Sequence, residues 1–310
     1  MQRHWLIGLL VVVLAACAAP SRAQEGDKPG DYVRKMDFGG ETRTYRLHIP
    51  PSYDGSQAVP LVVGLHGGGG SGRQFERSSE FSDQADEAGF IVVYPDGTGR
   101  IQTWNAGHCC GYALREKVDD VGYIRALVAE LQKDLKIDPR RIYATGMSNG
   151  AMMTYWLGAT SPDLFAAIAP VAGTIGGQEA EGATLVQIPT PGQAVSVIAL
   201  HGMQDERVQY EGGASTGVDA GRIDLSVAES INFWLNVDGC DPAYKEDITH
   251  AGNIIRQAYT CQPDGIDVVL YTVVDGVHAW PGADSITDKA TQDISATDLI
   301  WEFFASHPKP

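Results

Sequence analysis

The stretch that decides the fold is Arg141-Ile142-Tyr143-Ala144-Thr145-Gly146-Met147-Ser148-Asn149-Gly150-Ala151-Met152-Met153. Its first part, Ile142 to Thr145, is β-branched and aromatic, which predicts a buried strand. Its last part continues to Leu157 with the Ala, Met and Leu content of a packed helix. Ser148 lies in G-x-S-x-G at the turn between them. The pattern predicts a strand–turn–helix unit that lifts this serine clear of the sheet.

The residues around this serine fit a nucleophile. Side chains at Gly146 or Gly150 would clash, because the strand and helix backbones pass close together at such a turn. The amide of Asn149 begins the helix, where unpaired N–H groups and the helix dipole favour negative charge. We therefore expect Ser148 to be the nucleophile and Asn149 to form half of an oxyanion hole. The alternative is a chance G-x-S-x-G in a glycine-rich chain, and the order of the other motifs argues against it.

Composition limits the class of protein. The chain has 310 residues, of which 44% are hydrophobic and 20% charged, enough for one large domain with a substantial core. We expect that domain over residues 31–307. The formal net charge of −16 argues against nucleic acid as a partner and against electrostatic attachment to an anionic membrane. Its simplest meaning is solubility.

The N-terminus predicts export. Residues 1–16 have a basic start and an apolar run too short to span a bilayer, which is typical of a signal peptide. Leu14-Ala15-Ala16-Cys17 resembles the lipobox of bacterial lipoproteins, so we expect Cys17 to be lipidated and residues 17–30 to be a tether. The lipid would be the only membrane contact, in the periplasm or cell envelope. The alternative is cleavage after Ala23 and a soluble secreted protein.

Four further cysteines would then lie in an oxidising compartment: Cys109, Cys110, Cys240 and Cys261. Three pairings are possible and the sequence alone does not choose among them. We favour Cys240–Cys261, with a vicinal Cys109–Cys110 bridge as the second. No C-x-x-C spacing or adjacent histidine pair accompanies these cysteines, so no metal site is expected.

Earlier in the chain, a glycine run follows another predicted buried strand, residues 61–65. It reads His66-Gly67-Gly68-Gly69-Gly70-Ser71-Gly72. A phosphate-binding loop is not favoured, because the run lacks the Lys-Ser/Thr of a P-loop. An H-G-G-G-type loop fits its position, and we expect the amide of Gly68 to be the second oxyanion donor, with Gly67 as the alternative. We expect His66 to shape the loop through hydrogen bonds.

A long segment, residues 98–117, leaves the carboxyl end of the predicted strand 90–94, where open α/β sheets place their sites. We expect it to line the pocket. Trp104 within it and Trp280 further on are candidates for substrate binding, although a tryptophan is as often core. The paired carboxylates Asp119 and Asp120 precede an apolar helical period, which favours a helix N-cap over acid–base chemistry.

Two more strand ends supply an acid and a base. The predicted strand 195–200 leads to Asp205, with the neighbouring Glu206 as its rival. The predicted strand 268–273 leads to His278. Serine, acid and histidine in this order after successive strands are typical of α/β-hydrolases.

The remaining pattern agrees with an α/β fold, a mostly parallel sheet with helices on both faces. We expect an entry hairpin over 33–38 and 42–49, a strand over 165–171, and a loop or small cap without a fold of its own over 174–193. Helices are expected over 78–88, 121–131, 225–237 and 295–304.

These motifs together resemble the esterase family of polyhydroxybutyrate depolymerases and of feruloyl and acetylxylan esterases. The resemblance covers nearly the whole mature chain. It rests on Leu65-His66-Gly67-Gly68, Tyr94-Pro95-Asp96-Gly97, Trp104-Asn105-Ala106-Gly107 with Cys109-Cys110-Gly111, Gly146 to Met153, Asp163 to Gly173, His201-Gly202 with Asp205, Tyr210-Glu211-Gly212-Gly213 and His278-Ala279-Trp280-Pro281-Gly282.

The resemblance implies an α/β-hydrolase fold, no cofactor, and a catalytic triad of Ser148, Asp205 and His278. It implies a serine carboxylic ester hydrolase that forms an acyl-enzyme on polyhydroxybutyrate-type oligoesters or on feruloyl or acetyl esters of plant polysaccharide. The alternatives are a thioesterase or peptidase of the same fold, and a non-catalytic polymer- or carbohydrate-binding surface protein.

The chain departs from the family at two points. Met-Gln-Asp-Glu-Arg surrounds the acid, where a small residue and a proline are common, so the turn there is expected to differ. No separate polymer-binding module is visible, which disfavours a crystalline polymer as the substrate.

Overall fold

The computed structural model describes residues 28–216, 221–262, 265–283 and 289–310. The predicted signal peptide, the predicted lipidation site Cys17 and most of the tether lie outside these residues. Within the described ranges, no helix is both long enough and apolar enough to cross a membrane.

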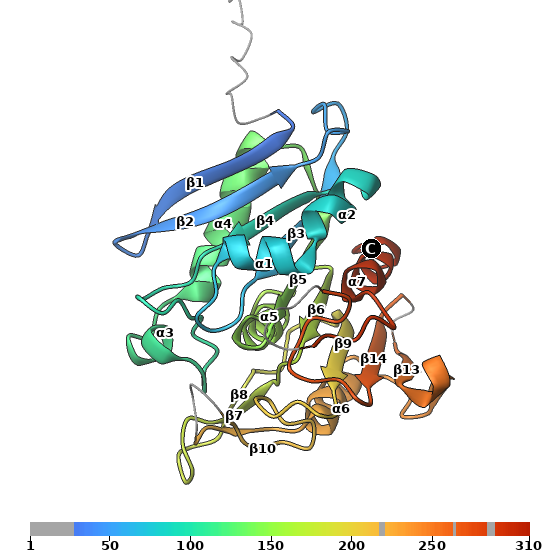
Figure 1. The fold of residues 1–310 in the computed structure, drawn as a ribbon. Coiled ribbons are helices and arrows are strands. Elements are labelled where there is room, and N and C mark those ends of the chain that lie inside the picture. The colour runs from blue at the N-terminus through green and yellow to red at the C-terminus, as the bar shows by residue number, and fades with distance from the viewer. Residues whose placement is uncertain (1–27, 217–220, 263–264, 284–288) are drawn as a thin grey trace, which may run out of the picture.

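A ten-stranded sheet forms the centre of the domain, in the order β1-β2-β4-β3-β5-β6-β9-β14-β13-β12 (Figure 1). The six central strands, from β4 to β14, run parallel, and an antiparallel pair flanks them on each side. The strands are β1 Gly30–Phe38, β2 Glu41–Ile49, β3 Val59–Leu65, β4 Ile91–Pro95, β5 Ile137–Met147, β6 Ala167–Val171, β9 Ser196–Gly202, β12 Tyr244–Thr249, β13 Ile254–Thr260 and β14 Asp267–Val273.

Helices cover both faces of this sheet. Side chains alternate along the buried central strands, so Val63 and Ala144 face one core while Val62 and Tyr143 face the other. The first core receives α4 Asp120–Asp134, α5 Asn149–Thr160 and α6 Val227–Val237; the second receives α1 Gly72–Ser79, α2 Phe81–Ala88 and α7 Ala296–Ser306. Burial on both faces explains why the central strands are continuous apolar runs. The predicted α/β sheet with helices on both faces is confirmed.

Several predicted elements differ from the structure. The helix expected over 78–88 is two helices, α1 and α2, because Glu80 between them adopts a left-handed conformation with φ 54°. The segment 174–193, expected to lack a fold of its own, contributes β7 Gly176–Gln178 and β8 Val186–Gln187 to a second sheet. These strands pair with β10 Gly213–Ala214 and β11 Ile223–Asp224 in the order β10-β11-β7-β8. Strands of two or three residues are too short to leave a periodic pattern in the sequence.

The structure also contains elements that the sequence pattern does not predict. The antiparallel edge strands β12 and β13 and the short helix α3 Gly111–Arg115 had no counterpart among the predicted elements. The predicted Cys240–Cys261 disulfide is present and joins the segment after α6 to the end of β13. The predicted helix cap is also confirmed, since Asp119 Oδ1 accepts a hydrogen bond from Gly122 N at the start of α4 (2.8 Å).

Candidate active site

Ser148 occupies the predicted sharp turn between β5 and α5. Its φ of 57° lies in the left-handed region, which a non-glycine residue adopts at a cost in backbone strain. The flanking glycines are required by packing, because a Cβ added at Gly146 would lie 2.6 Å from Gly150 O, and one at Gly150 would overlap Leu65 O. The structure therefore agrees with the predicted strand–turn–helix unit.

The glycine-rich loop after β3 runs beside this serine. A Cβ added at Gly67 would lie 3.3 Å from Ser148 Cβ, and one at Gly68 would lie 3.7 Å from Asn149 Cβ. Among the described residues, none accepts a hydrogen bond from the amides of Gly67 or Gly68. The Asn149 amide at the first position of α5 has no acceptor within its own helix either. Both candidate loop amides and the helix amide are thus available near Ser148.

His66 shapes this loop, as expected from the sequence. Its Nε2 accepts a hydrogen bond from Gly97 N (2.9 Å), so its proton lies on Nδ1, which donates to Gly67 O (2.7 Å). Burial lowers the pKa of the His66 ring, which favours this neutral form.

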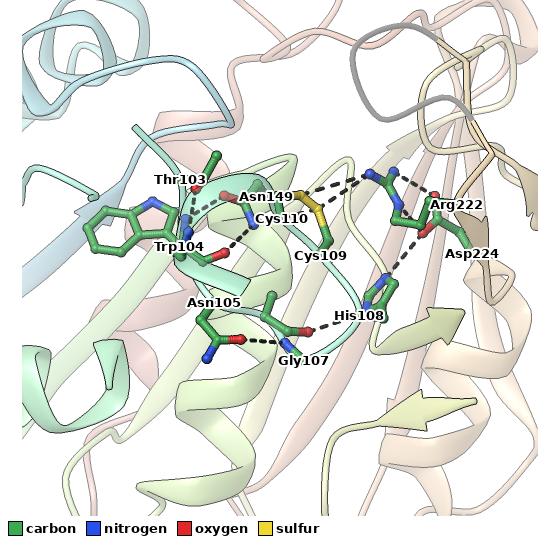
Figure 2. The surroundings of a disulfide bond; sticks show 12 residues. Thr103, Trp104, Asn105, Gly107, His108, Cys109, Cys110, Asn149, Arg222 and Asp224 are labelled. Atoms are coloured by element: carbon green, nitrogen blue, oxygen red, sulfur yellow. Dashed lines mark hydrogen bonds and ion pairs between the residues drawn. A yellow bond between two sulfur atoms is a disulfide. The ribbon is translucent and has the colours of Figure 1, made fainter. Parts of the chain in front are cut away.

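The side chain of Asn149 is clamped by the backbone of Trp104, as Figure 2 shows. Its Oδ1 accepts from Trp104 N (2.8 Å) and its Nδ2 donates to Trp104 O (3.0 Å). Trp104 is itself completely buried, and its Nε1 donates to His66 O (2.9 Å). Its predicted role as a substrate platform is therefore wrong for this structure, because the ring packs inside and supports the residues around Ser148.

Trp280 is also buried rather than exposed to substrate. Its ring packs edge-on against Phe75, with centroids 5.2 Å apart, and its Nε1 donates to Thr297 Oγ1 (3.0 Å). The second predicted substrate-binding residue is thus a core residue. A tryptophan beside a motif gives no sequence signal that separates these two roles.

The acid and the base meet at the carboxyl ends of β9 and β14. Asp205 Oδ2 lies 2.7 Å from His278 Nδ1, and both side chains are at least nine-tenths buried. The turn that carries Asp205 is tied to the loop that carries His278, since Gln204 N donates to Gly276 O (2.8 Å). Glu206, the rival acid, is exposed, and among the described residues the acid that pairs with His278 is Asp205.

Four N–H groups surround the carboxylate of Asp205. Its Oδ1 accepts from the amides of Arg207 (2.8 Å) and Val208 (2.9 Å), and its Oδ2 faces His278 and His201. Burial alone would raise the pKa of Asp205, but the hydrogen bonds from the two histidines hold it well below its usual range. The acid is therefore ionised at neutral pH.

Ser148, Asp205 and His278 all follow the carboxyl ends of parallel strands in one half of the sheet, whose order is β5-β6-β9-β14. Among the described residues, one hydrogen bond joins members of this set of three, and it runs between Asp205 and His278. Ser148 N donates to Val171 O at the end of β6 (3.0 Å), which fixes the serine backbone at the same edge.

A wide hollow opens beside His278, with a cavity volume of about 670 Å³. The acid turn and the residues after it form its wall. The lining is mostly polar, and its side chains include Gln204, Glu206, Gln209, Tyr210 and Glu211.

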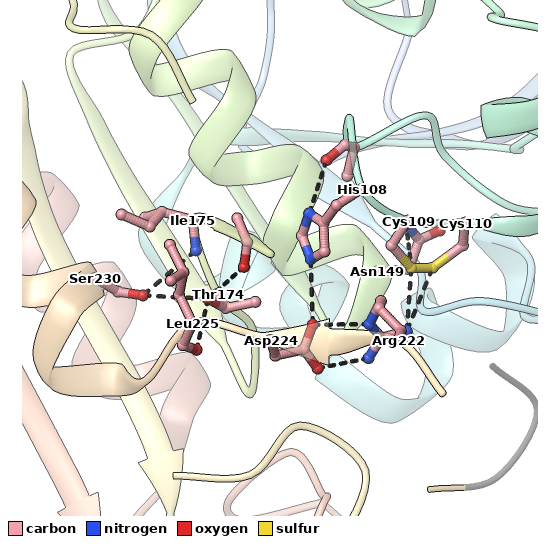
Figure 3. A network of polar contacts seen from close by, with 12 residues as sticks. His108, Cys109, Cys110, Asn149, Thr174, Ile175, Arg222, Asp224, Leu225 and Ser230 are labelled. Carbon is pink, nitrogen blue, oxygen red and sulfur yellow. Dashed lines mark hydrogen bonds and ion pairs between the residues drawn. A yellow bond between two sulfur atoms is a disulfide. The ribbon is translucent and has the colours of Figure 1, made fainter. Parts of the chain in front are cut away.

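A buried polar cluster lies next to Asn149, as Figures 2 and 3 show. The predicted Cys109–Cys110 disulfide is present, and Cys109 Sγ lies 3.4 Å from Arg222 Nη1. Arg222 pairs with Asp224 of β11 through two hydrogen bonds (2.7 and 2.8 Å), and His108 Nε2 lies 3.2 Å from the same carboxylate. No motif in the sequence marks Arg222, Asp224 and His108, because His108 and the Arg222–Asp224 pair meet from distant segments.

Across the described ranges, no cluster of three or more His, Cys, Asp or Glu side chains is arranged to hold a metal ion.

Three comparisons relate this chain to known proteins. The family model described as esterase PHB depolymerase matches residues 43–234. NocK of Nocardia uniformis subsp. tsuyamanensis, assigned as an esterase, is 33% identical over 289 residues, which cover 87% of this chain and 81% of NocK. Feruloyl esterase B of Piromyces equi is 32% identical over 237 residues, covering 75% of this chain and 42% of the relative, so this chain spans less than half of that protein.

Among solved structures, acetyl xylan esterase from Aspergillus awamori superposes with a TM-score of 0.58 and 18% identity, covering 89% of this chain and 99% of that one. At this identity the likeness concerns the fold alone. It confirms the predicted α/β-hydrolase fold.

Proposed function

Since this chain belongs to the esterase PHB depolymerase family and is a serine carboxylic ester hydrolase, we propose that Ser148, His278 and Asp205 form its catalytic triad. The observation that carries the proposal is the 2.7 Å contact between Asp205 Oδ2 and His278 Nδ1 at the sheet edge that also carries the strained serine. In such a triad the acid fixes the histidine tautomer and stabilises the imidazolium.

The reaction would follow from these positions. His278 Nε2 takes the hydroxyl proton of Ser148 as Oγ attacks the ester carbonyl, and later gives it to the leaving alcohol. The oxyanion of the tetrahedral intermediate would accept hydrogen bonds from Asn149 N and from a loop amide, Gly68 or Gly67. Each such donor contributes on the order of a hundredfold or more to the rate. Water then hydrolyses the acyl-enzyme.

The unpaired loop amides support the oxyanion part of this proposal. The sequence favours Gly68 as the donor, yet a Cβ added at Gly67, not one at Gly68, would contact Ser148. We therefore propose both amides as candidates, with Asn149 as the fixed partner. The clamp of Trp104 on the Asn149 side chain would keep the helix amide in place.

We further propose an ester of plant polysaccharide, feruloyl or acetyl, as the substrate class in preference to a hydroxybutyrate oligoester. The base delivers its proton to the leaving alcohol, so the alcohol lies on the His278 side of the site. There the hollow is lined by amide, carboxylate and phenol groups, which suit a hydroxyl-rich alcohol. The relatives named feruloyl esterase and acetylxylan esterase agree with this choice.

Labelling with a serine-directed fluorophosphonate tests the nucleophile. We expect one adduct, located on Ser148 by mass spectrometry, and none in Ser148→Ala. We also expect Ser148→Ala and His278→Ala each to remove most turnover, and the double variant to lose little more, because triad members act as a unit. An adduct elsewhere, or roughly additive losses, would contradict the triad.

A matched substrate panel tests the substrate class. Methyl ferulate, acetylated xylan and hydroxybutyrate oligomers would be compared by kcat/KM, together with thioester and amide analogues of the best ester. We expect the polysaccharide esters to be preferred. A preference for hydroxybutyrate oligomers would overturn this part of the proposal while leaving the triad intact.

We also propose that the enzyme is exported, through the signal peptide over residues 1–16, and anchored by a lipid on Cys17. The two disulfides support an oxidising compartment. Mass spectrometry of the mature N-terminus checks this proposal: an acylated Cys17 is expected, and an unmodified N-terminus downstream of it would favour the soluble secreted form.

A further inference from the structure

A second histidine lies against the acid of the proposed triad. We propose that His201 is a positioning residue, whose Nε2–H closes the turn around Asp205 and holds its carboxylate toward His278. The inference rests on the proposed function, because it assigns a role relative to that triad. His201 belongs to a stretch that carries the family resemblance, but the order of Ser, Asp and His assigns it no role.

The proton position of His201 follows from its contacts. Nε2 lies 2.8 Å from Val208 O and 3.4 Å from Asp205 Oδ2. A carbonyl oxygen only accepts hydrogen bonds, so Nε2 carries a proton. That N–H is directed at the carbonyl and lies close to the carboxylate, and both acceptors are shielded from solvent.

The contacts form a closed ring through the acid turn. Val208 N donates to Asp205 Oδ1 (2.9 Å), while Val208 O accepts from His201, which in turn faces Asp205 Oδ2. His201 thus holds both the carboxylate and the backbone that presents it. Loss of this donor would leave a buried carbonyl unpaired and one carboxylate oxygen with a single N–H, and unpaired buried acceptors are costly.

The neighbouring strand holds the His201 ring in place. Thr272 of β14 is its register partner, and Thr272 Oγ1 hydrogen-bonds with Tyr210 OH (2.8 Å). The Tyr210 ring meets His201 edge-on, with centroids 5.9 Å apart. His201 is 4% exposed, so it does not contact substrate and acts through Asp205.

A positioning role makes a specific prediction about charge. The Nε2–H shares the negative charge of Asp205 Oδ2 with His278 Nδ1–H. Without it, more of that charge acts on His278, which favours the imidazolium. We therefore expect removal of the donor to lower kcat and to move the acid limb of the kcat/KM pH profile to higher pH.

The test compares His201→Gln with His201→Asn on a soluble small ester. The Gln amide reaches the place of Nε2, whereas the Asn amide is shorter and does not. We expect His201→Asn to lose about 10- to 100-fold in kcat, with KM changed less than about threefold. Its acid limb should move up by about half a pH unit or more. His201→Gln should keep most of kcat and an unmoved acid limb.

A second readout reports the hydrogen bond directly. The downfield proton NMR signal of His278 Nδ1–H, assigned by its loss in His278→Ala, should shift in His201→Asn and stay near its place in His201→Gln. Equal losses in the two variants with no movement of the acid limb or the signal would show that His201 only packs. Full activity in both would also overturn the inference.

Ser148→Ala separates this inference from the proposed function. If it keeps turnover, the triad itself is wrong. If it is inactive while the His201 variants match the parent, only the positioning role fails.

Discussion

Two buried carboxylates lie at opposite ends of strand β9. Asp205 follows its carboxyl end, and Asp238 contacts its amino end, where Val195 N donates to Asp238 Oδ1 (3.1 Å). Their exposures are similar, 4% and 1%. Their surroundings differ, because four N–H groups face Asp205, whereas Asp238 Oδ2 has no hydrogen-bond partner among the described residues.

The charge states of these two groups diverge accordingly. Burial raises the pKa of Asp238 to about 7, and its single amide donor offsets only part of this. Burial also acts to raise the pKa of Asp205, yet its hydrogen bonds with His201 and His278 hold it well below the usual range. The number of donors, rather than the depth of burial, therefore decides which carboxylate has a lowered pKa and which has a raised one.

The largest expected effect is the loss of activity when the carboxylate of Asp205 is replaced. Asp205→Asn removes the charge that stabilises the imidazolium and disturbs the histidine tautomer, so kcat should fall about 10³- to 10⁴-fold. Its thermal unfolding temperature should change little by comparison. Steady-state kinetics and calorimetry on the same samples measure both quantities.

Glu206→Gln is the matched control for this change, since it neutralises the adjacent, exposed carboxylate. On a small soluble ester that does not fill the hollow lined by Glu206, we expect its kcat to stay within about twofold of the parent. The assignment of the acid would be contradicted if Glu206→Gln lost activity and Asp205→Asn kept it.

The second expected effect concerns stability at the Asp238 end. The folded-state pKa of Asp238, about 7, is above its unfolded value, so the folded protein binds the extra proton in between. The protonated Asp238 contributes fully to the unfolding free energy at low pH. This contribution decreases by up to about 4 kcal/mol as pH rises from about 4 through 7. In Asp238→Asn, the unfolding free energy should no longer decrease with rising pH through this residue.

Urea unfolding at pH 5, 6, 7 and 8 checks the Asp238 prediction. The difference in unfolding free energy between Asp238→Asn and the parent should grow in favour of the variant as pH rises. A difference that stays constant with pH would mean that Asp238 is already ionised in the folded protein. Kinetics at pH 7 should be unchanged, because Asp238 lies at the far end of β9 from Asp205.

The smallest expected effect tests whether a change near Asp238, at the amino end of β9, affects only stability and leaves the chemistry at the Asp205 end unchanged. The Cys240–Cys261 disulfide closes a chain segment of 21 residues just after Asp238. Replacing both cysteines by serine should lower the unfolding free energy by about 3 kcal/mol, since the unfolded chain is then less constrained. The kcat at 25 °C should remain that of the parent, and a loss of kcat in fully folded protein would show that the two ends are coupled.

Local patterns predicted the parts of the site that depend on neighbouring residues. The strand–turn–helix unit around Ser148 follows from a strand pattern, two glycines and a helix pattern within thirteen residues. Asp205 and His278 were found by their position after successive buried strands, and the structure brings them within hydrogen-bonding distance. Their roles as acid and base stay predictions that kinetics will test.

Other predictions failed because burial is a property of the whole fold. Trp104 and Trp280 lie next to recognisable motifs, yet both are covered by segments far away in the chain. Strands of the small second sheet are too short for a period to be visible, so the sequence of the segment 174–193 predicts a loop.

The sequence by itself determined the class of fold, the serine turn and the order of the three candidate catalytic residues, because these depend on periodicity and on turn residues close together in the chain. Only the tertiary structure decided which buried groups are satisfied. Three of the donors around Asp205, the amides of Arg207 and Val208 and the ring of His201, lie within four residues of it. His278 at Asp205 and the single amide of Val195 at Asp238 come from segments that meet only after the sheet is assembled. The electrostatics of a buried carboxylate are a sum over such non-local neighbours, which no local pattern records.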